Sequence, residues 1–279
     1  MASFRYNESD VNYDVTGHGP DVLFMHGLTA DRRQASAALD ALEGYRLISV
    51  DMPGHGDSEL SASRPLSEQV GFEVYTDIAA ALLDHLGIEK VIAGGISMGS
   101  GIALALALMR PDLVQAMFLV RPAWLDQPGR PHLGVIEDIG NWIAQSGPDV
   151  AREKLRSHPV YMSAEIDNPS CASSLVGAME RPQAEAAAMV LPTLVADRPV
   201  SRLGVLQTIA VPALVVGNNA DPLHPAMIAR EICGALANAT YFHAPPKYLE
   251  PEAHKSAVTQ NIKQFLEVHR LSADASVHS

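Results

Sequence analysis

Short apolar runs alternate with longer helical patterns along most of this chain. The apolar runs, each leading into a loop, cover residues 21–27, 45–56, 90–97, 115–124, 211–221 and 239–246. Several are apolar throughout, which is typical of strands buried on both faces. Residues 67–87 and 100–111 have helical patterns that end at Gly or Pro, and Ser67 is the expected cap of the first. This alternation predicts an α/β fold with a mostly parallel central sheet flanked by helices.

The pattern changes at two places. Residues 5–19 look like an N-terminal hairpin, and between Trp124 and Leu206 proline-punctuated helical pieces replace the strands. We therefore expect a helical cap over 124–206 inserted into a discontinuous core domain. That core is expected to comprise residues 1–123 and 207–270, and the small polar residues 271–279 are expected to form a flexible tail.

Composition and charge narrow the class of protein. Of 279 residues, 47% are hydrophobic and 5% aromatic, which is typical of a globular chain. The net charge of -12 disfavours nucleic acid and anionic membranes as partners. Cys171 and Cys233 cannot build a disulfide framework, and we find neither a signal peptide nor an apolar stretch long enough to cross a bilayer. We expect a cytoplasmic protein that acts on a small molecule; the sequence does not indicate its oligomeric state.

A serine between glycines carries the clearest chemical signal. The sequence Gly95-Ile96-Ser97-Met98-Gly99 stands where a buried strand turns directly into a helix, which is the required setting of the G-x-S-x-G motif. In this turn the serine would project from the sheet edge as a nucleophile, and the Met98 amide would meet negative charge on a substrate oxygen. A plain packing turn or a phosphate loop is the alternative, but the G-x-G-x-x-G and G-K-[ST] patterns are absent.

A serine nucleophile needs a base and an acid to orient that base. His254 follows the last predicted strand just before the terminal helix, so we predict it as the base. Asp221 comes directly after an apolar strand, and Pro222 breaks regular structure there, so we predict Asp221 as the acid. An ordinary turn or capping role for Asp221 stays open.

Together these residues resemble the α/β-hydrolase family, in which the order along the chain is nucleophile, acid, histidine. The resemblance covers residues 1–123 and 207–270, and Asp126 stands where some members carry the acid. The family often has Gly-His at the base, whereas this chain has Ala253-His254.

Two loops extend the resemblance. The His-Gly loop at His26-Gly27 implies that the Leu28 amide joins Met98 in an oxyanion hole, with His26 as a hydrogen bonder of the loop. Residues 51–58 resemble a structural turn of the family, which implies structural roles for Asp51 and His55.

The resemblance implies hydrolysis of a carboxylic ester or lactone through an acyl-enzyme, without cofactor or metal. The same three residues also serve carbon–carbon bond hydrolysis, amide hydrolysis and cofactor-free haloperoxidase activity, and a non-catalytic ligand receptor on this scaffold is the remaining alternative. Arg121 could bind a substrate carboxylate or pair with an acidic neighbour. The cap residues that could line an apolar pocket, or pack within the cap, are Trp124, Trp142, Tyr161, Met162 and Met179.

Overall fold

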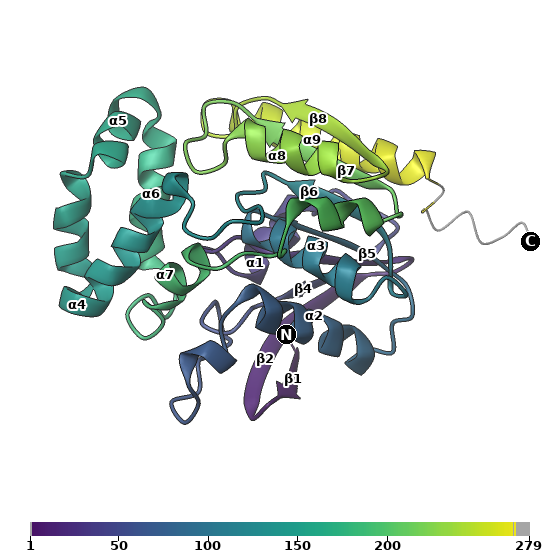
Figure 1. Cartoon of the computed structure of the whole chain (residues 1–279), viewed down its shortest axis with the longest axis horizontal. Helices are drawn as coiled ribbons and strands as arrows, with labels where there is room; N and C mark the ends of the chain where they lie inside the picture. The colour runs from purple at the N-terminus through teal and green to yellow at the C-terminus, as the bar shows by residue number, and fades with distance from the viewer. Residues whose placement is uncertain (1, 270, 272–279) are drawn as a thin grey trace, which may run out of the picture.

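The computed structural model describes residues 2–269 and 271. Within them, eight strands form one sheet in the order β1-β2-β4-β3-β5-β6-β7-β8 (Figure 1). The strands are β1 (Ala2–Tyr6), β2 (Ser9–Gly17), β3 (Asp21–Met25), β4 (Arg46–Val50), β5 (Val91–Ile96), β6 (Val114–Val120), β7 (Ala213–Asn218) and β8 (Ala239–Ala244). β1 and β2 form the predicted hairpin and pair antiparallel, as do β2 and β4. All pairs from β4 to β8 are parallel, which confirms the predicted fold class.

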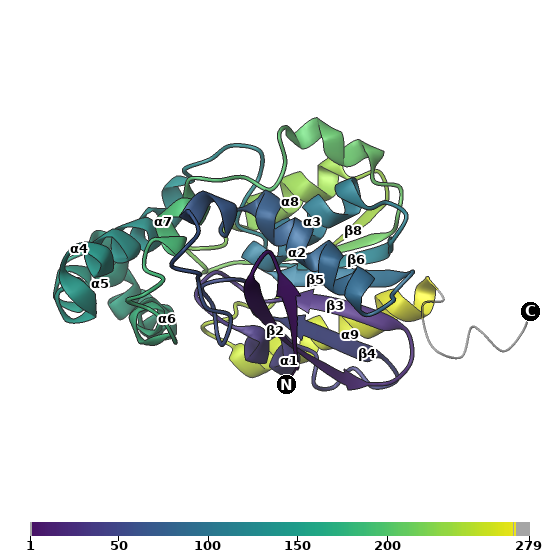
Figure 2. The same cartoon turned by 90° about the horizontal axis from the view of Figure 1, so that it is seen from below.

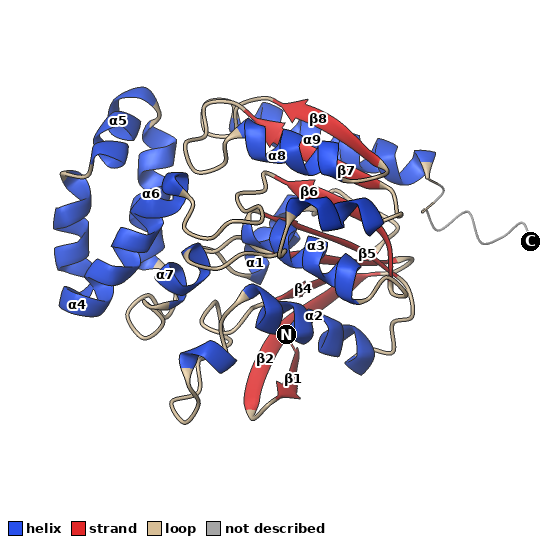
Figure 3. Ribbon diagram, viewed as in Figure 1, coloured by secondary structure: helices blue, strands red, loops and turns tan. Residues whose placement is uncertain are grey.

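Helices cover both faces of this sheet (Figure 3). The helices on the faces of the sheet are α1 (Arg32–Ala38), α2 (Phe72–His85), α3 (Met98–Met109), α8 (Ala226–Ala235) and α9 (Pro251–Val268). The other α-helices of the described residues are α4 (Gly134–Arg156), α5 (Pro159–Asp167), α6 (Pro169–Glu180) and α7 (Val190–Val195). Short 3-10 helices lie at Leu66–Glu68, Pro131–Leu133 and Leu203–Thr208.

Alternating side chains of the central strands enter two apolar layers. Val22 and Phe24 pack with α1 and α9 on one face, whereas Leu23 and Met25 pack with α2, α3 and α8 on the other. This period of two is the expected geometry of a strand buried on both faces. Figure 2 shows the two layers on opposite sides of the sheet.

Helices α4 to α7 lie between β6 and β7 in the chain and stand beyond the carboxyl ends of the parallel strands (Figures 1 and 2). They occupy the range in which the sequence predicts an inserted cap. Gly147 has φ of 81° and interrupts α4 just before Pro148. Apart from Leu271, the predicted tail over 271–279 lies outside the described residues.

One helix start differs from the prediction. Ser67 lies in the 3-10 helix Leu66–Glu68, and α2 begins at Phe72 instead. Its preceding residue, Gly71, has φ of 153° and no side chain with which to cap. The Phe72 N–H instead donates to Asp197 Oδ2 at 2.7 Å. The cap therefore comes from a residue 125 positions further along the chain.

Candidate active site

Ser97 occupies a sharp turn between β5 and α3. Its φ of 56° and ψ of -110° place a non-glycine residue in the strained positive-φ region. A Cβ added at Gly95 would collide with the backbone of Gly99, and a Cβ added at Gly99 would collide with the carbonyl oxygen of Met25. The two glycines are thus required by close backbone approach. The turn presents the buried Ser97 hydroxyl to a pocket at the sheet edge.

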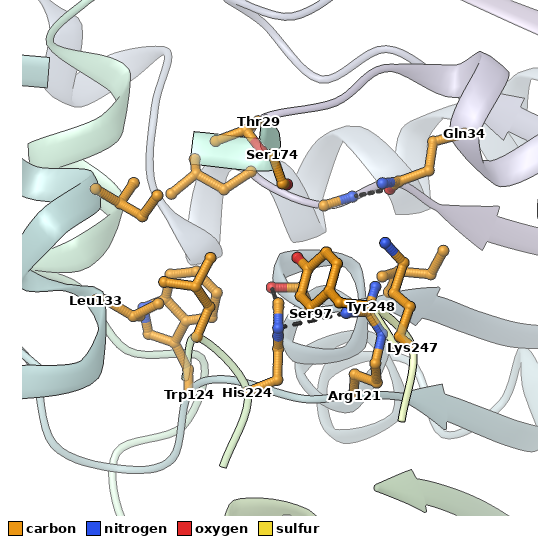
Figure 4. A pocket seen from close by; sticks show the side chains of 15 residues that line it. Thr29, Gln34, Ser97, Arg121, Trp124, Leu133, Ser174, His224, Lys247 and Tyr248 are labelled. Carbon is orange, nitrogen blue, oxygen red and sulfur yellow. Dashed lines mark hydrogen bonds between the residues drawn. The ribbon is translucent and has the colours of Figure 1, made fainter. Parts of the chain in front are cut away.

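The Ser97 hydroxyl is hydrogen-bonded to a histidine, which is in turn hydrogen-bonded to a carboxylate from the same loop. His224 Nε2 lies 2.9 Å from Ser97 Oγ, and His224 Nδ1 lies 2.9 Å from Asp221 Oδ1. Both residues belong to the loop between β7 and α8, and both are buried. Figure 4 shows His224 pointing at Ser97 from below the pocket. The three side chains form one continuous hydrogen-bonded chain from hydroxyl to carboxylate.

The charges around this chain favour a neutral imidazole beside an ionised acid. Burial lowers the pKa of His224 below its ordinary value of 6.5, Asp221 raises it in part, and Arg121 lowers it again. Burial also acts to raise the pKa of Asp221, but His224 and Arg121 outweigh it and hold that pKa well below its usual range. Arg121 Nη1 donates to Asp221 Oδ2 at 2.8 Å. His224 is therefore ready to accept a proton at neutral pH.

The structure does not bring His254 to Ser97. His254 lies in the first turn of α9, where its Nδ1 donates to the Pro245 carbonyl at 2.8 Å. It lines a second, largely apolar cavity with residues of α1 and α9. Burial lowers the pKa of His254 to about 4. The sequence prediction placed the base after the last strand, but the histidine that faces Ser97 is His224.

The two candidate acids occupy different places. Asp221 lies beside the histidine that contacts Ser97, as described above. Asp126 Oδ2 instead accepts the Leu203 N–H at 2.8 Å, and its Oδ1 lies 3.7 Å from Arg130. Asp126 therefore holds the chain where it returns from the helices α4 to α7.

The loop after β3 borders the nucleophile. A Cβ added at Gly27 would lie 3.6 Å from the Ser97 Cβ, and Gly27 and Leu28 both line the pocket. The His55 Nε2 donates to the Leu28 carbonyl at 2.8 Å, and His26 Nδ1 donates to the Gly27 carbonyl at 2.8 Å. These bonds agree with the expected loop-fixing role of His26. Met98, on the other side of Ser97, is the first residue of α3, so its N–H has no acceptor within the helix.

The turn over residues 51–58 packs against the loop after β3 and is held by hydrogen bonds of its own. The Asp51 carboxylate forms a buried ion pair with Arg32, and it accepts the Arg32 N–H at 2.7 Å and the Asp57 N–H at 2.9 Å. Asp51 and His55 are therefore engaged in the scaffold, away from the Ser97 hydroxyl.

The pocket mouth combines polar and apolar walls. Trp124 and Leu133 lie on one side of Ser97 in Figure 4, and Arg121, Lys247 and Tyr248 lie on the other. The residues that line the pocket are Gly27, Leu28, Thr29, Gln34, Ile96, Ser97, Arg121, Trp124, Leu133, Ile136, Ser174, Leu223, His224, Lys247 and Tyr248. Of the residues predicted to bind substrate, Arg121 and Trp124 line this pocket.

The remaining cap candidates lie outside this lining. Trp142 of α4 packs edge-on against His158, the residue just before α5, and the Lys154 ammonium lies 6.0 Å from the centre of the Trp142 ring. Met162 is 52% exposed, Met179 is buried in the core cluster, and Tyr161 packs at the edge of that cluster. Trp142 is therefore part of the cap packing and does not face Ser97.

Among residues 2–269 and 271, no group of three or more His, Cys, Asp or Glu side chains is arranged to hold a metal ion. No helix in the same residues is both long and apolar enough to span a bilayer. Cys171 and Cys233 are free thiols.

Comparison with known proteins shows which proteins this chain resembles. Residues 20–145 match the family described as alpha/beta hydrolase fold, and this range contains Ser97 and the loop after β3. The chain has the alpha/beta hydrolase fold. A solved structure with a similar fold is that of a thermophilic esterase from Thermogutta terrifontis, with a TM-score of 0.71 and 22% identity over 94% of each chain.

Two curated proteins match over shorter stretches. The dihydrolipoyllysine-residue acetyltransferase component of an acetoin cleaving system from Cupriavidus necator is 35% identical over 43% of this chain and 32% of its own length. The 2-hydroxymuconate semialdehyde hydrolase of Pseudomonas sp. is 34% identical over 42% of this chain and 41% of its own length. This chain therefore spans about a third to two fifths of these relatives.

The family order of nucleophile, acid and histidine also holds for Ser97, Asp221 and His224. Because His224 follows Asp221 by three positions, chain order alone does not separate it from His254. The loop between β8 and α9 instead places Lys247 and Tyr248 at the pocket. The short Asp-x-x-His spacing in one loop is the sequence signal that could have identified His224.

Proposed function

We propose that the protein is a serine hydrolase that cleaves carboxylic esters or lactones through an acyl-enzyme on Ser97. The observation that carries this proposal is the hydrogen-bonded chain Ser97–His224–Asp221, with 2.9 Å at both links. A serine hydroxyl becomes an effective nucleophile when a positioned imidazole takes its proton. The neutral state favoured for His224 meets this requirement at physiological pH.

The residues divide the reaction as follows. His224 Nε2 takes the Ser97 proton as Oγ attacks the substrate carbonyl, and Asp221 holds the imidazole in the tautomer that accepts at Nε2. The tetrahedral oxyanion lies between the Leu28 and Met98 amides, where each donor is typically worth about 3 kcal/mol. The protonated His224 then gives its proton to the leaving oxygen. Water activated by the same imidazole hydrolyses the acyl-enzyme and restores Ser97.

Arg121 has a supporting role in this scheme. Its ion pair with Asp221 fixes the carboxylate oxygen that does not contact His224. A buried carboxylate with both oxygens engaged has little freedom to rotate away from the imidazole. The scheme uses only groups of this chain and needs no cofactor.

Two measurements test the proposal. The first is hydrolysis of a panel of p-nitrophenyl esters and lactones by the wild-type protein and by Ser97→Ala. We expect turnover by the wild type and a loss of at least about a thousandfold in the variant. The second is covalent labelling by a fluorophosphonate, which should modify the wild type and leave Ser97→Ala unlabelled. Turnover that persists in Ser97→Ala, or no turnover on any ester or lactone, would overturn the proposal.

A further inference from the structure

Arg121 brings a buried guanidinium to the pocket wall. The residue follows β6, has φ of 49° and is 4% exposed. Its Nη1 is engaged by Asp221, but its Nε is buried without a hydrogen-bond partner among the described residues. An unpaired buried N–H of a charged group is costly to the folded state.

Lys247 brings a second cation to the same wall. It lies in the loop between β8 and α9, and its Nζ lies 4.3 Å from the centre of the Tyr248 ring. No carboxylate of the described residues lies within ion-pair distance of this ammonium group. Burial, reinforced by the nearby Arg121 charge, lowers the pKa of Lys247 to about 8. The ammonium form is therefore retained at neutral pH at a cost in solvation.

The charged side chains that line the pocket are all positive. Arg121 and Lys247 both line it, whereas no Asp or Glu does, because Asp221 lies behind Arg121 and His224. In Figure 4 the two cationic side chains lie side by side next to Ser97. A substrate anion at this wall would lie close to both cations and would pair with them.

We propose that Arg121 and Lys247 form a subsite for a carboxylate group of the substrate, next to the ester carbonyl that Ser97 attacks. This inference rests on the proposed function and narrows it to esters or lactones that carry a free carboxylate, such as monoesters of short dicarboxylic acids. A carboxylate suits the wall because Arg121 and Lys247 both carry positive charge there and no acidic side chain lines the pocket. The other side of the guanidinium is held by Asp221.

Binding to the Ser97→Ala protein tests the subsite without turnover. Titration calorimetry compares monomethyl glutarate, which carries one carboxylate, with dimethyl glutarate, which is neutral and of nearly the same shape. We expect the monoanion to bind at least about tenfold more tightly, as a charge-assisted contact in a desolvated site requires. Adding Lys247→Met should remove most of this preference, and adding Lys247→Arg should retain it.

The control is Lys90→Met in the same Ser97→Ala background. Lys90 precedes β5 at the opposite end of that strand from Ser97, and its Nζ donates to the Asp112 carbonyl on the surface. This variant removes the same charge and should keep the full preference for the monoanion. Equal affinities for the two ligands, binding of neither, or a preference unchanged in Lys247→Met would overturn the subsite. Hydrolysis of a neutral p-nitrophenyl ester by the wild type is a separate result, which tests only the proposed function.

Discussion

His224 combines two features that a serine nucleophile needs in one side chain. It is hydrogen-bonded to Ser97 on one nitrogen and to Asp221 on the other, and burial keeps it unprotonated. The acid and the base come from a single loop only three residues apart. Their mutual orientation is therefore set locally, and only the approach of Ser97 depends on the rest of the fold.

The pKa of His224 should determine how kcat/KM falls at low pH. Protonated His224 cannot accept the Ser97 proton, so kcat/KM should rise with pH as His224 loses its proton. Because burial lowers this pKa, we expect the midpoint below pH 6.5. The pH profile of kcat/KM on a neutral ester gives the midpoint directly. A midpoint at pH 7 or above would contradict the role assigned to His224.

The charged Lys247 side chain should lower the free energy of unfolding at neutral pH. Its pKa is about 8 in the folded state against an ordinary value of 10.5, so folding disfavours its charged form. Lys247→Met should therefore raise the free energy of unfolding at pH 7 by about 1–3 kcal/mol. Above pH 8 the folded state releases this proton before the unfolded state does, so the gain should shrink and vanish near pH 10.5. Urea denaturation at pH 7, 9 and 10.5 measures it, and a destabilised Lys247→Met protein at pH 7 would contradict this account.

Single residues also show what the sequence could and could not predict. Ser97 and Asp221 were identifiable because a tight turn and the end of a buried strand leave signatures in neighbouring residues. Lys247 has no such signature, and His224 has only its short spacing from Asp221, since the direction in which a loop side chain points depends on packing with distant segments. The prediction of His254 followed the usual position of the base after the last strand, and here that histidine binds the Pro245 carbonyl.

At the scale of elements, the junction of β5 and α3 is the most constrained part of the fold. The turn works only because Gly95, Gly99 and Met25 approach at backbone distance. This constraint was readable from the sequence because it fixes residue type at fixed spacing. The start of α2 was not, because its cap is the carboxylate of Asp197, far away in the chain.

A methyl group at Gly99 should disrupt the junction. Gly99→Ala places a Cβ against the Met25 carbonyl oxygen, and we expect it to cost about 2–4 kcal/mol in the free energy of unfolding. Because the shift displaces Ser97 and Met98, ester hydrolysis should fall at least about a hundredfold.

The matched control is Gly177→Ala in α6. No atom lies within 4 Å of a Cβ added there, and helical alanine is favoured over glycine by about 0.5–1 kcal/mol. Thermal denaturation and ester assays of the two variants together separate steric conflict from a general effect of the substitution. Equal behaviour of the two variants would refute the assigned constraint.

At the scale of the whole molecule, helices from two parts of the chain meet at the pocket. Strand and helix periodicity predicted the sheet and its flanking layers, because burial on both faces imposes a pattern on every strand. The detailed packing of α4 to α7 was not predictable, since prolines mark where helices end and not where they pack. Trp124 illustrates the point: it is buried at 2% exposure and contacts both parts.

Trp124 should therefore matter more for stability than Trp142. Its Nε1 donates to the Leu194 carbonyl of α7 at 3.0 Å, and its ring packs edge-on against Phe72 of α2. Trp124→Phe should lower the free energy of unfolding by about 1–3 kcal/mol through the lost hydrogen bond and ring area. Trp142→Phe, in a half-buried ring, should cost less than about 1 kcal/mol. Chemical denaturation of both variants measures the two free energies of unfolding. A larger decrease in Trp142→Phe than in Trp124→Phe would contradict the assigned contacts.

The central claim is that His224 is the base that activates Ser97. Its most direct test is the hydrolysis of one p-nitrophenyl ester by His224→Gln and His254→Gln, two substitutions of buried histidines by the same residue. The account predicts a loss of kcat/KM of at least about a thousandfold in His224→Gln and a change within about threefold in His254→Gln, with both proteins folded by circular dichroism. Near-normal turnover by His224→Gln, or a comparable loss in His254→Gln, would contradict it.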